Sequence, residues 1–168
     1  RTETRAVQQG SHPWKGDRDL GGGALFGFGS HVVYVLDHLF GRIQRVTARL
    51  HPDTGADRRA DFWLNAGNLE GNVSIATDAV RGTGFRLEIY ATDRMLCLAN
   101  RTLDSFRNFT LTSRRRGETA EEMLVDERSA TSAGDGRIAP VSRIARRFVD
   151  AIVRGDQTFP NLADGARV

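Results

Sequence analysis

The sequence predicts an α+β fold: an open, mostly antiparallel β-sheet with helices packed on one of its faces. Three observations lead to this prediction. An apolar segment with helical spacing stands near the start of the chain, and a second one begins at Pro140. Between them, segments that alternate apolar and polar residues are separated by short turns. Because parallel neighbours need long crossovers, such short connections favour antiparallel pairing.

The chain has 168 residues and a mass of 18.5 kDa, the size of one ordinary domain. Its single cysteine, Cys97, excludes an internal disulfide framework and a multi-cysteine zinc site. Cys97 lies in an apolar segment, so we expect a buried, unreactive thiol. No apolar run approaches the ~18 residues of a membrane-spanning helix. We therefore expect a cytoplasmic, globular domain with no metal and no membrane partner.

The charge balance argues against a nucleic-acid partner. The chain has 24 basic and 21 acidic residues, a net charge of +3 and a pI of about 9.7. Because Lys15 is the only lysine, few groups titrate between neutral pH and about pH 10. The high pI therefore does not indicate a strong positive field. Residues 114–116 and 146–147 are arginines that could contact phosphates, but acidic residues lie nearby, and we favour solvated faces.

We divide the chain into an entry segment, residues 1–20, and one domain, residues 21–168. Residues 21–40 predict a helix, and Gly41 is placed to cap its C-terminus. Alternating patterns predict the following strands: 42–50, 61–66, 72–77, 85–91, 94–99 and, more weakly, 106–112. Met123 to Val125 could add a further strand.

The last helix is predicted from Pro140 to Gly155. Apolar residues recur on one face, and proline suits a first helical turn as glycine suits a helix end. Residues 156–168 are predicted to be coil. An apolar sheet face that these helices leave uncovered would need a partner, which favours a homo-oligomer.

The first helix carries a polar stripe that could belong to a site. On a regular α-helix, Gly27, His31, Tyr34 and His38 fall within about 40° of one another. The stripe is either a solvated face or the wall of a substrate cleft in which His31 exchanges a proton. The two histidines are about 10 Å apart along the helix axis, too far to share one metal ion.

Two neighbouring features have alternative interpretations. The glycines that open the helix suggest a phosphate loop, but no strand precedes them and neither phosphate-binding pattern is present. Close packing of the helix explains them better. Trp14 stands in a polar loop before the helix, where it either covers a pocket or packs over the helix start.

Two segments resemble the glucose–fructose oxidoreductase / inositol dehydrogenase (Gfo/Idh/MocA) family. Residues 21–41, GGGALFGFGSHVVYVLDHLFG, resemble its pattern GGGALxDxGxHxxDxxxxLxG. Residues 148–167 resemble its pattern FVDAIxxGxxxxPxxxDGxR. The two motifs stand in the same order and at fitting spacing, and the resemblance covers nearly the whole chain.

The resemblance implies the C-terminal domain of a two-domain oxidoreductase. In that family an N-terminal Rossmann domain binds NAD or NADP, and the C-terminal domain supplies much of the pocket for a sugar- or polyol-like substrate. Its sheet commonly forms the oligomer interface. The family's nucleotide-binding turn and Glu-Lys-Pro lysine are not in this sequence, which begins with Arg1. We expect a domain that is truncated at both ends and inactive by itself.

The resemblance also assigns residues. His31 matches the family's catalytic histidine, while Gly27 and Tyr34 stand where the pattern has aspartates. His31 then acts alone, Tyr34 takes over a hydrogen-bonding role, or the parent is a non-catalytic binding or assembly module. We expect the substrate's hydroxyl groups at His31. Further candidates for substrate binding are Trp14, Lys15, Arg18 and Tyr34.

Overall fold

The computed structural model describes the chain in six stretches: residues 13–52, 55–77, 84–102, 107–119, 121–126 and 136–168. They belong to two compact units. Unit 1 comprises residues 1–81 and 159–168, and unit 2 comprises residues 82–158. The fold is α+β with antiparallel sheets, as predicted. The described strands form two sheets, one in each unit, where the sequence suggested one continuous sheet.

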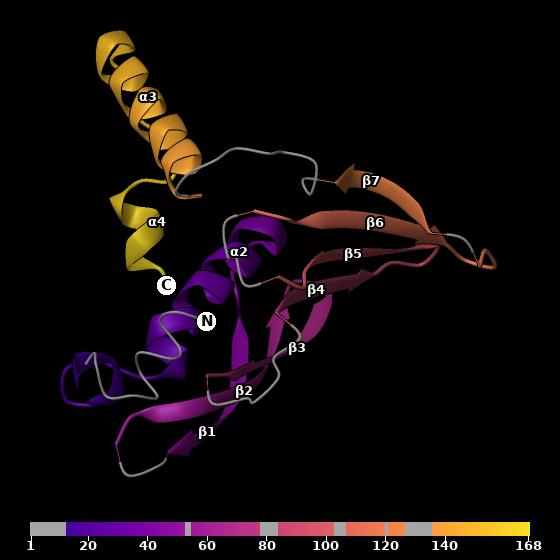
Figure 1. Cartoon of the computed structure of the whole chain (residues 1–168), viewed down its shortest axis with the longest axis horizontal. Helices are drawn as coiled ribbons and strands as arrows, with labels where there is room; N and C mark the ends of the chain where they lie inside the picture. Colours follow the sequence, from indigo (N-terminus) through magenta and orange to yellow (C-terminus); the bar gives the residue numbers. More distant parts are fainter. Residues whose placement is uncertain (1–12, 53–54, 78–83, 103–106, 120, 127–135) are drawn as a thin grey trace. The chain divides into compact units, whose positions relative to one another are not determined.

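Unit 1 holds the first helical region and a three-stranded antiparallel sheet (Figure 1). Its elements are η1 (Pro13–Gly16), η2 (Leu25–Gly29), α2 (Ser30–Phe40), β1 (Arg45–Pro52), β2 (Asp57–Ala66), β3 (Leu69–Ala76) and α4 (Leu162–Ala166). The sheet order is β1-β2-β3. Gly41 ends α2 at φ 81°, the positive-φ conformation that glycine adopts without strain, so the predicted helix end is confirmed.

The core of unit 1 lies between β2 and the helical region. Alternate residues of β2 are buried: Ala60, Phe62, Leu64 and Ala66. Their period of two places them on the face toward η2 and α2, whose buried Leu36 joins the core. β2 begins earlier than predicted because Arg59 and Ala60 pair with both neighbouring strands although the local sequence is polar.

The opposite face of this sheet is polar around one exposed tryptophan. Trp63 is 58% exposed at the centre of β2, between Thr47 on β1 and Asn72 on β3. The neighbouring row is Arg49, Asp61 and Ser74. The sheet face that the helices leave uncovered is therefore mostly polar, whereas we expected an apolar one.

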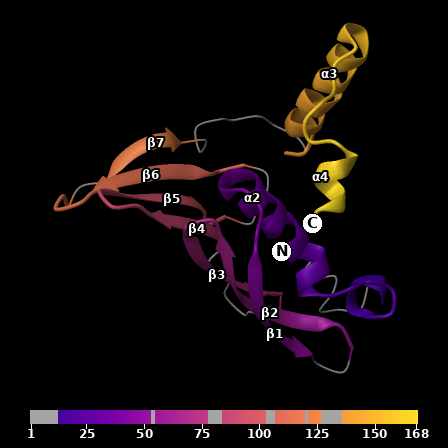
Figure 2. The ribbon, with the colours of Figure 1, turned by 180° about the vertical axis from the view of Figure 1, so that it is seen from behind.

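Unit 2 contains a four-stranded antiparallel sheet and one long helix (Figure 2). Its elements are β4 (Phe85–Tyr90), β5 (Arg94–Asn100), β6 (Thr110–Arg115), β7 (Glu122–Asp126) and α3 (Ile138–Arg154). The sheet order is β4-β5-β6-β7. One row across the sheet is wholly apolar: Leu87, Leu98, Leu111 and Val125.

The structure corrects two element predictions and confirms a third. β6 starts at Thr110 and not near residue 106, because Asn108 adopts a positive φ of 66° that interrupts the extended chain. The coil predicted for residues 156–168 contains α4, which Asn161 and Asp164 begin with a reciprocal capping box. α3 ends at Gly155 in the left-handed conformation, as predicted.

Candidate functional site

The candidate site is built on the start of the first helix, and the glycines there serve packing. A Cβ on Gly22 would clash with the backbone carbonyls of Trp14 and Lys15, and one on Gly23 would clash with the Asp57 carboxylate. The N–H groups of Gly22 and Gly23 donate to the carbonyls of Asp17 and Lys15, at 2.8 and 2.9 Å. These donors are therefore already used, which agrees with the packing interpretation and disfavours a phosphate loop.

Asp57 anchors this helix from the neighbouring strand. Its Oδ2 accepts a hydrogen bond from the N–H of Leu25 at 2.9 Å. The carboxylate thereby satisfies one of the unpaired donors at a helix N-terminus and is favoured there by the helix dipole. The sequence did not indicate this role of Asp57, because the helix start that it contacts lies 32 positions earlier in the chain.

The helix does not begin as a regular α-helix. Residues Leu25–Gly29 form a π-helical turn, and Ser30 N–H bonds to the carbonyl of Leu25. A Cβ on Gly29 would press on Leu25 and on Ile75 of β3, so this glycine allows close packing on the sheet. The predicted polar stripe assumes α-helical periodicity along the whole first helix. It holds for His31, Tyr34 and His38 within α2, whereas the π turn shifts Gly27 out of that alignment.

His31 lies in the first turn of α2 and its side chain is exposed. Its imidazole ring has no hydrogen bond, ion pair or ring contact with any other described residue. A Cβ on Gly27 would meet nothing within 4 Å, so the surface one turn before His31 is open. An unengaged imidazole beside open space can donate a proton to a bound molecule or accept one from it.

The two other aromatic members of the stripe pack on each other. The rings of Tyr34 and His38 are stacked with centroids 6.3 Å apart, and His38 stacks on Phe159 at 4.8 Å. Phe159 comes from the C-terminal segment, which the sequence did not connect with this helix. Tyr34, a predicted substrate-binding residue, is half-buried in this stack, whereas His31 is not part of it.

The remaining predicted site residues lie in and after η1. Trp14 is 48% exposed, and the Nζ of Lys15 stands 5.4 Å from the centre of its ring, within cation–π range. Arg18 is exposed in the turn that follows, and its carbonyl accepts from Gly21 N–H at 3.1 Å. Backbone hydrogen bonds therefore tie this loop to the helix start, while the placement of these side chains around a substrate stays a prediction.

A second charged group links α4 to α2. Arg167 Nη2 lies 3.3 Å from Asp37 Oδ2 and 2.8 Å from Asp164 Oδ1. Asp164 is buried, and its Oδ2 accepts the N–H of Asn161 at 2.8 Å. One arginine between two carboxylates fixes the C-terminal segment against the helix that carries His31.

Shifted pKa values occur away from His31, at Asp61 in the sheet of unit 1 and at Arg86, Glu88 and Tyr90 on β4 of unit 2. A hydrogen bond from Ser74 lowers the pKa of the Asp61 carboxyl, with a smaller contribution from His51, whose Nε2 lies 3.0 Å away. A hydrogen bond from Arg86 lowers the pKa of Glu88. Both carboxylates lie on sheet surfaces, and their partners explain the shifts without a catalytic role.

The described residues offer no metal site and only limited room for a cofactor. They contain no group of three or more His, Cys, Asp and Glu side chains that could hold a metal ion. At Gly27, one turn before His31, an added Cβ would meet nothing within 4 Å, so this surface leaves room for a ligand. The helix start does not fit the cofactor's pyrophosphate, because the Asp57 carboxylate and backbone carbonyls already occupy its donors. In all of the described residues, no helix is long and apolar enough to cross a membrane.

A family model matches the chain over residues 2–97, more than half of its length. The model describes the GFO/IDH/MocA C-terminal domain. The match includes the first helical region, all of β1 to β4 and the first part of β5.

Individual proteins similar to this chain in sequence or structure are also oxidoreductases. An uncharacterized oxidoreductase of Synechocystis sp. is 29% identical over 96% of this chain and 49% of its own length. The chain thus spans about half the length of this curated relative. A structure assigned to an NADPH-dependent oxidoreductase of Desulfitobacterium hafniense gives a TM-score of 0.70 at 17% identity, over 92% of this chain and 45% of that one. UDP-N-acetylglucosamine 3-dehydrogenase from Acidithiobacillus ferrooxidans gives 0.63 at 19% identity, over 86% and 43%. The two structures show the shared fold.

Proposed function

Because the chain belongs to the GFO/IDH/MocA family through its C-terminal domain, we propose that it is the substrate-binding and oligomerisation domain of an NAD(P)-dependent oxidoreductase. Its substrate is a sugar, a polyol or a related hydroxy compound. The observation that carries the proposal is His31, exposed beside open space on a helix whose start is fixed by Asp57. In this proposal residues 1–20 are the entry segment, and residues 21–168 are the substrate-binding and oligomerisation domain.

In this proposal His31 moves a proton at the substrate oxygen. A ring nitrogen of the imidazole takes the proton from the substrate hydroxyl during oxidation and returns it during reduction. The nicotinamide supplies the hydride acceptor or donor when it is bound, and a nucleotide-binding domain holds most of that cofactor. Tyr34, Trp14, Lys15 and Arg18 contribute to substrate binding around this helix start. The sugar-like class follows from the family, and the name of the Acidithiobacillus ferrooxidans neighbour fits it.

The test of this role uses the protein in which this chain is joined to its nucleotide-binding domain. Replacing His31 by Ala should lower kcat by about 100-fold or more, the usual contribution of a positioned acid–base group. His51→Ala is the matched control, because His51 lies on β1 and contacts Asp61 on the sheet. Steady-state assays over a panel of sugars and polyols measure both variants. Equal turnover in His31→Ala and the unsubstituted protein contradicts the assignment.

A second candidate function is a binding or assembly module without catalysis, and Gly27 favours it. A carboxylate beside the histidine would orient it and tune its pKa, and glycine does neither. The open space at Gly27 accepts an added side chain, so Gly27→Asp is a direct probe. If the reaction geometry survives, this variant gains rate and the uncharged Gly27→Asn does not. A parent that turns over no substrate, with or without the aspartate, supports the module.

Cofactor binding and assembly are tested on the chain itself. Calorimetry should show no tight binding of NAD or NADP to this chain, because at the described helix start the donors that could hold a pyrophosphate are already used. Self-association through a sheet face is supported by the exposed Trp63 in unit 1 and by Val125, 48% exposed, in unit 2. Light scattering should therefore give a mass above 18.5 kDa, and a clean monomer argues against it.

A further inference from the structure

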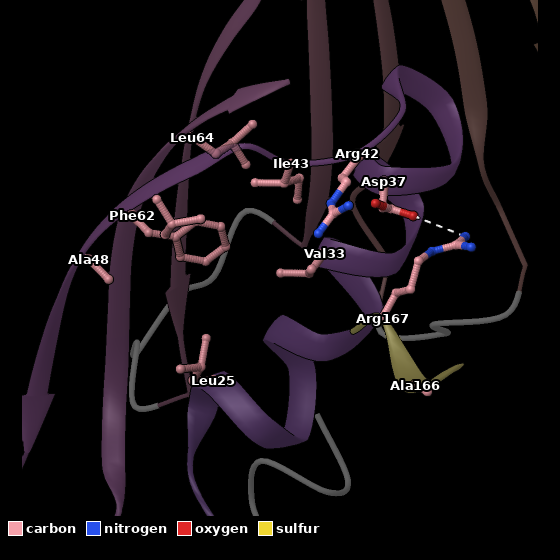
Figure 3. A pocket seen from close by; sticks show the side chains of 11 residues that line it. Leu25, Val33, Asp37, Arg42, Ile43, Ala48, Phe62, Leu64, Ala166 and Arg167 are labelled. Atoms are coloured by element: carbon pink, nitrogen blue, oxygen red, sulfur yellow. Dashed lines mark ion pairs between the residues drawn. The ribbon is translucent and has the colours of Figure 1, made fainter. Parts of the chain in front are cut away.

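A cavity of about 670 Å³ lies within unit 1, between α2, the three-stranded sheet and α4 (Figure 3). Its residues come from the helical region, from β1 and β2, and from the C-terminal segment. The volume falls in the range of about 300–1,000 Å³ that small-molecule sites occupy. The space is large enough for a ligand and is not accounted for by the proposed reaction.

The cavity is on the other side of α2 from His31. At about 100° per residue, Val33 lies about 200° and Asp37 about 240° around the helix from His31. Val33 and Asp37 line the cavity, and His31 does not. A molecule bound there would sit beneath the helix, away from the proposed proton-transfer group. Binding in this cavity therefore does not depend on the proposed proton transfer at His31.

Most of the cavity wall is apolar. The side chains of Leu25 and Val33 face it from the helical region, and those of Phe62 and Leu64 from β2 (Figure 3). Phe62 and Leu64 are only 3% and 2% exposed, so this wall belongs to the fixed core of unit 1. The cavity is open to solvent on one side, so an apolar group that binds against this wall removes apolar surface from water.

The charged residues at the cavity are Asp37, Arg42 and Arg167. Arg167 is held by both Asp37 and Asp164, as described above. Arg42, just after the helix end, has no ion pair with any carboxylate in the described part of the chain. Figure 3 shows its guanidinium beside Val33. The cavity thus combines an apolar wall with the exposed Arg42, which pairs with no carboxylate of the described residues.

We propose that this cavity binds an amphipathic monocarboxylate. The apolar body lies against Leu25, Val33 and Phe62, and the carboxylate accepts hydrogen bonds from the Arg42 guanidinium. Guanidinium and carboxylate match in a planar, two-bond geometry that is stronger than a neutral hydrogen bond. A purely apolar molecule would leave the guanidinium unused, and a phosphate dianion would need a second free cation, whereas Arg167 is already paired.

The test is a calorimetric titration of the chain with decanoate, with decanol as the neutral partner of the same length. Decanoate should bind saturably with one site per chain, and decanol at least about tenfold more weakly. Methyl resonances of Val33 and Leu64 should shift on binding. Absence of saturable decanoate binding, or equal binding of decanol, overturns the proposal.

Two variants localise the site. Arg42→Gln should weaken decanoate binding by about tenfold or more, because it removes the charge and keeps much of the side-chain length. Arg45→Gln is the matched control on the neighbouring strand, since Arg45 does not line the cavity, and it should change affinity less than about twofold. Ala48→Phe should abolish binding by filling the space. Unchanged affinity in Arg42→Gln refutes the assignment even if the Ala48 variant fails to fold.

Discussion

The two units of this chain use the same antiparallel pairing but differ in how their sheets are covered. In unit 1, η2 and α2 lie over one sheet face, so alternate residues of β2 are almost fully buried. In unit 2, the apolar row that includes Leu98 and Val125 is only partly buried, and Val125 remains 48% exposed. The helix of unit 2 also presents an exposed apolar face, with Phe148 at 57% and Ile152 at 64%.

The two units are stabilised by different interactions. Unit 1 has a core and a helix anchored by Asp57, which is what a precisely positioned histidine requires. Among the described residues, unit 2 buries fewer apolar side chains, namely Cys97, Ala99 and Ala151, and its sheet also buries polar groups. Asn100 is 3% exposed, donates to the carbonyl of Arg107 at 2.8 Å and accepts from Thr102 N–H at 2.9 Å. Its exposed apolar surfaces are of the kind that contacts with another surface can cover.

The largest expected effect compares one phenylalanine from each unit. Phe62→Ala should lower the free energy of unfolding by about 3–5 kcal/mol, because it leaves a void in the core of unit 1. Phe148→Ala on α3 should cost no more than about 0.5 kcal/mol, since its side chain already contacts water. Urea denaturation followed by circular dichroism measures both. A large loss for Phe148→Ala would mean that its face is covered in solution, and the contrast between the units would disappear.

The next effect concerns the anchor of the first helix. Asp57→Ala should cost about 1–2 kcal/mol, because the N–H of Leu25 loses its acceptor and the helix start loses a favourable charge. Asp156→Ala is the control in unit 2, where the carboxylate is 66% exposed and lies 3.8 Å from Arg154. Its cost should stay below about 0.5 kcal/mol. Equal costs for the two variants in thermal or urea unfolding would show that Asp57 does not anchor the helix.

The smallest effect is on acid stability, where the two units should behave alike. The folded pKa of Asp61 lies below its ordinary value of 3.8, so its stabilising contribution is complete above about pH 5 and is lost as the pH falls through the folded value. Ser74→Ala removes the main cause of this shift. It should lower the urea midpoint slightly at about pH 6 and leave it unchanged at about pH 2.

Arg86→Gln tests the equivalent carboxylate of unit 2. The pKa of Glu88 is lowered by its hydrogen bond with Arg86, so the same loss on acidification is expected. Both groups lie at the surface, and salt should weaken both effects. An effect of Ser74→Ala that grows as the pH falls would have the wrong sign and would contradict the assignment.

Most of the fold was predictable because local pattern determines strands and helix ends. Alternation located the central strands, and Gly41 and Gly155 marked two helix ends correctly because a positive φ favours glycine. The errors occurred where local signals were weak. The Asn108 turn delayed β6, and the capping box at Asn161 formed α4 in a segment that looked like coil.

The candidate site was only partly predictable. The two family motifs identified the family, which the family model confirms, and they selected His31, whose role remains a proposal. Asp57 and Phe159 were missed because each reaches the helix from a distant part of the chain. The π turn was missed because the helical wheel assumed one periodicity from residue 24 to residue 40.

The amino-acid sequence by itself determined the fold class, the family and the positions of most strands, because hydrophobic periodicity and glycine conformations act over a few residues. The tertiary structure alone decided which glycines are needed for close packing and which carboxylate anchors the helix. It also decided that Tyr34 and His38 are stacked, while the His31 side chain contacts no polar or aromatic partner among the described residues. It also revealed the cavity on the opposite side of α2. These properties depend on contacts between segments far apart in the chain, and local pattern does not encode them.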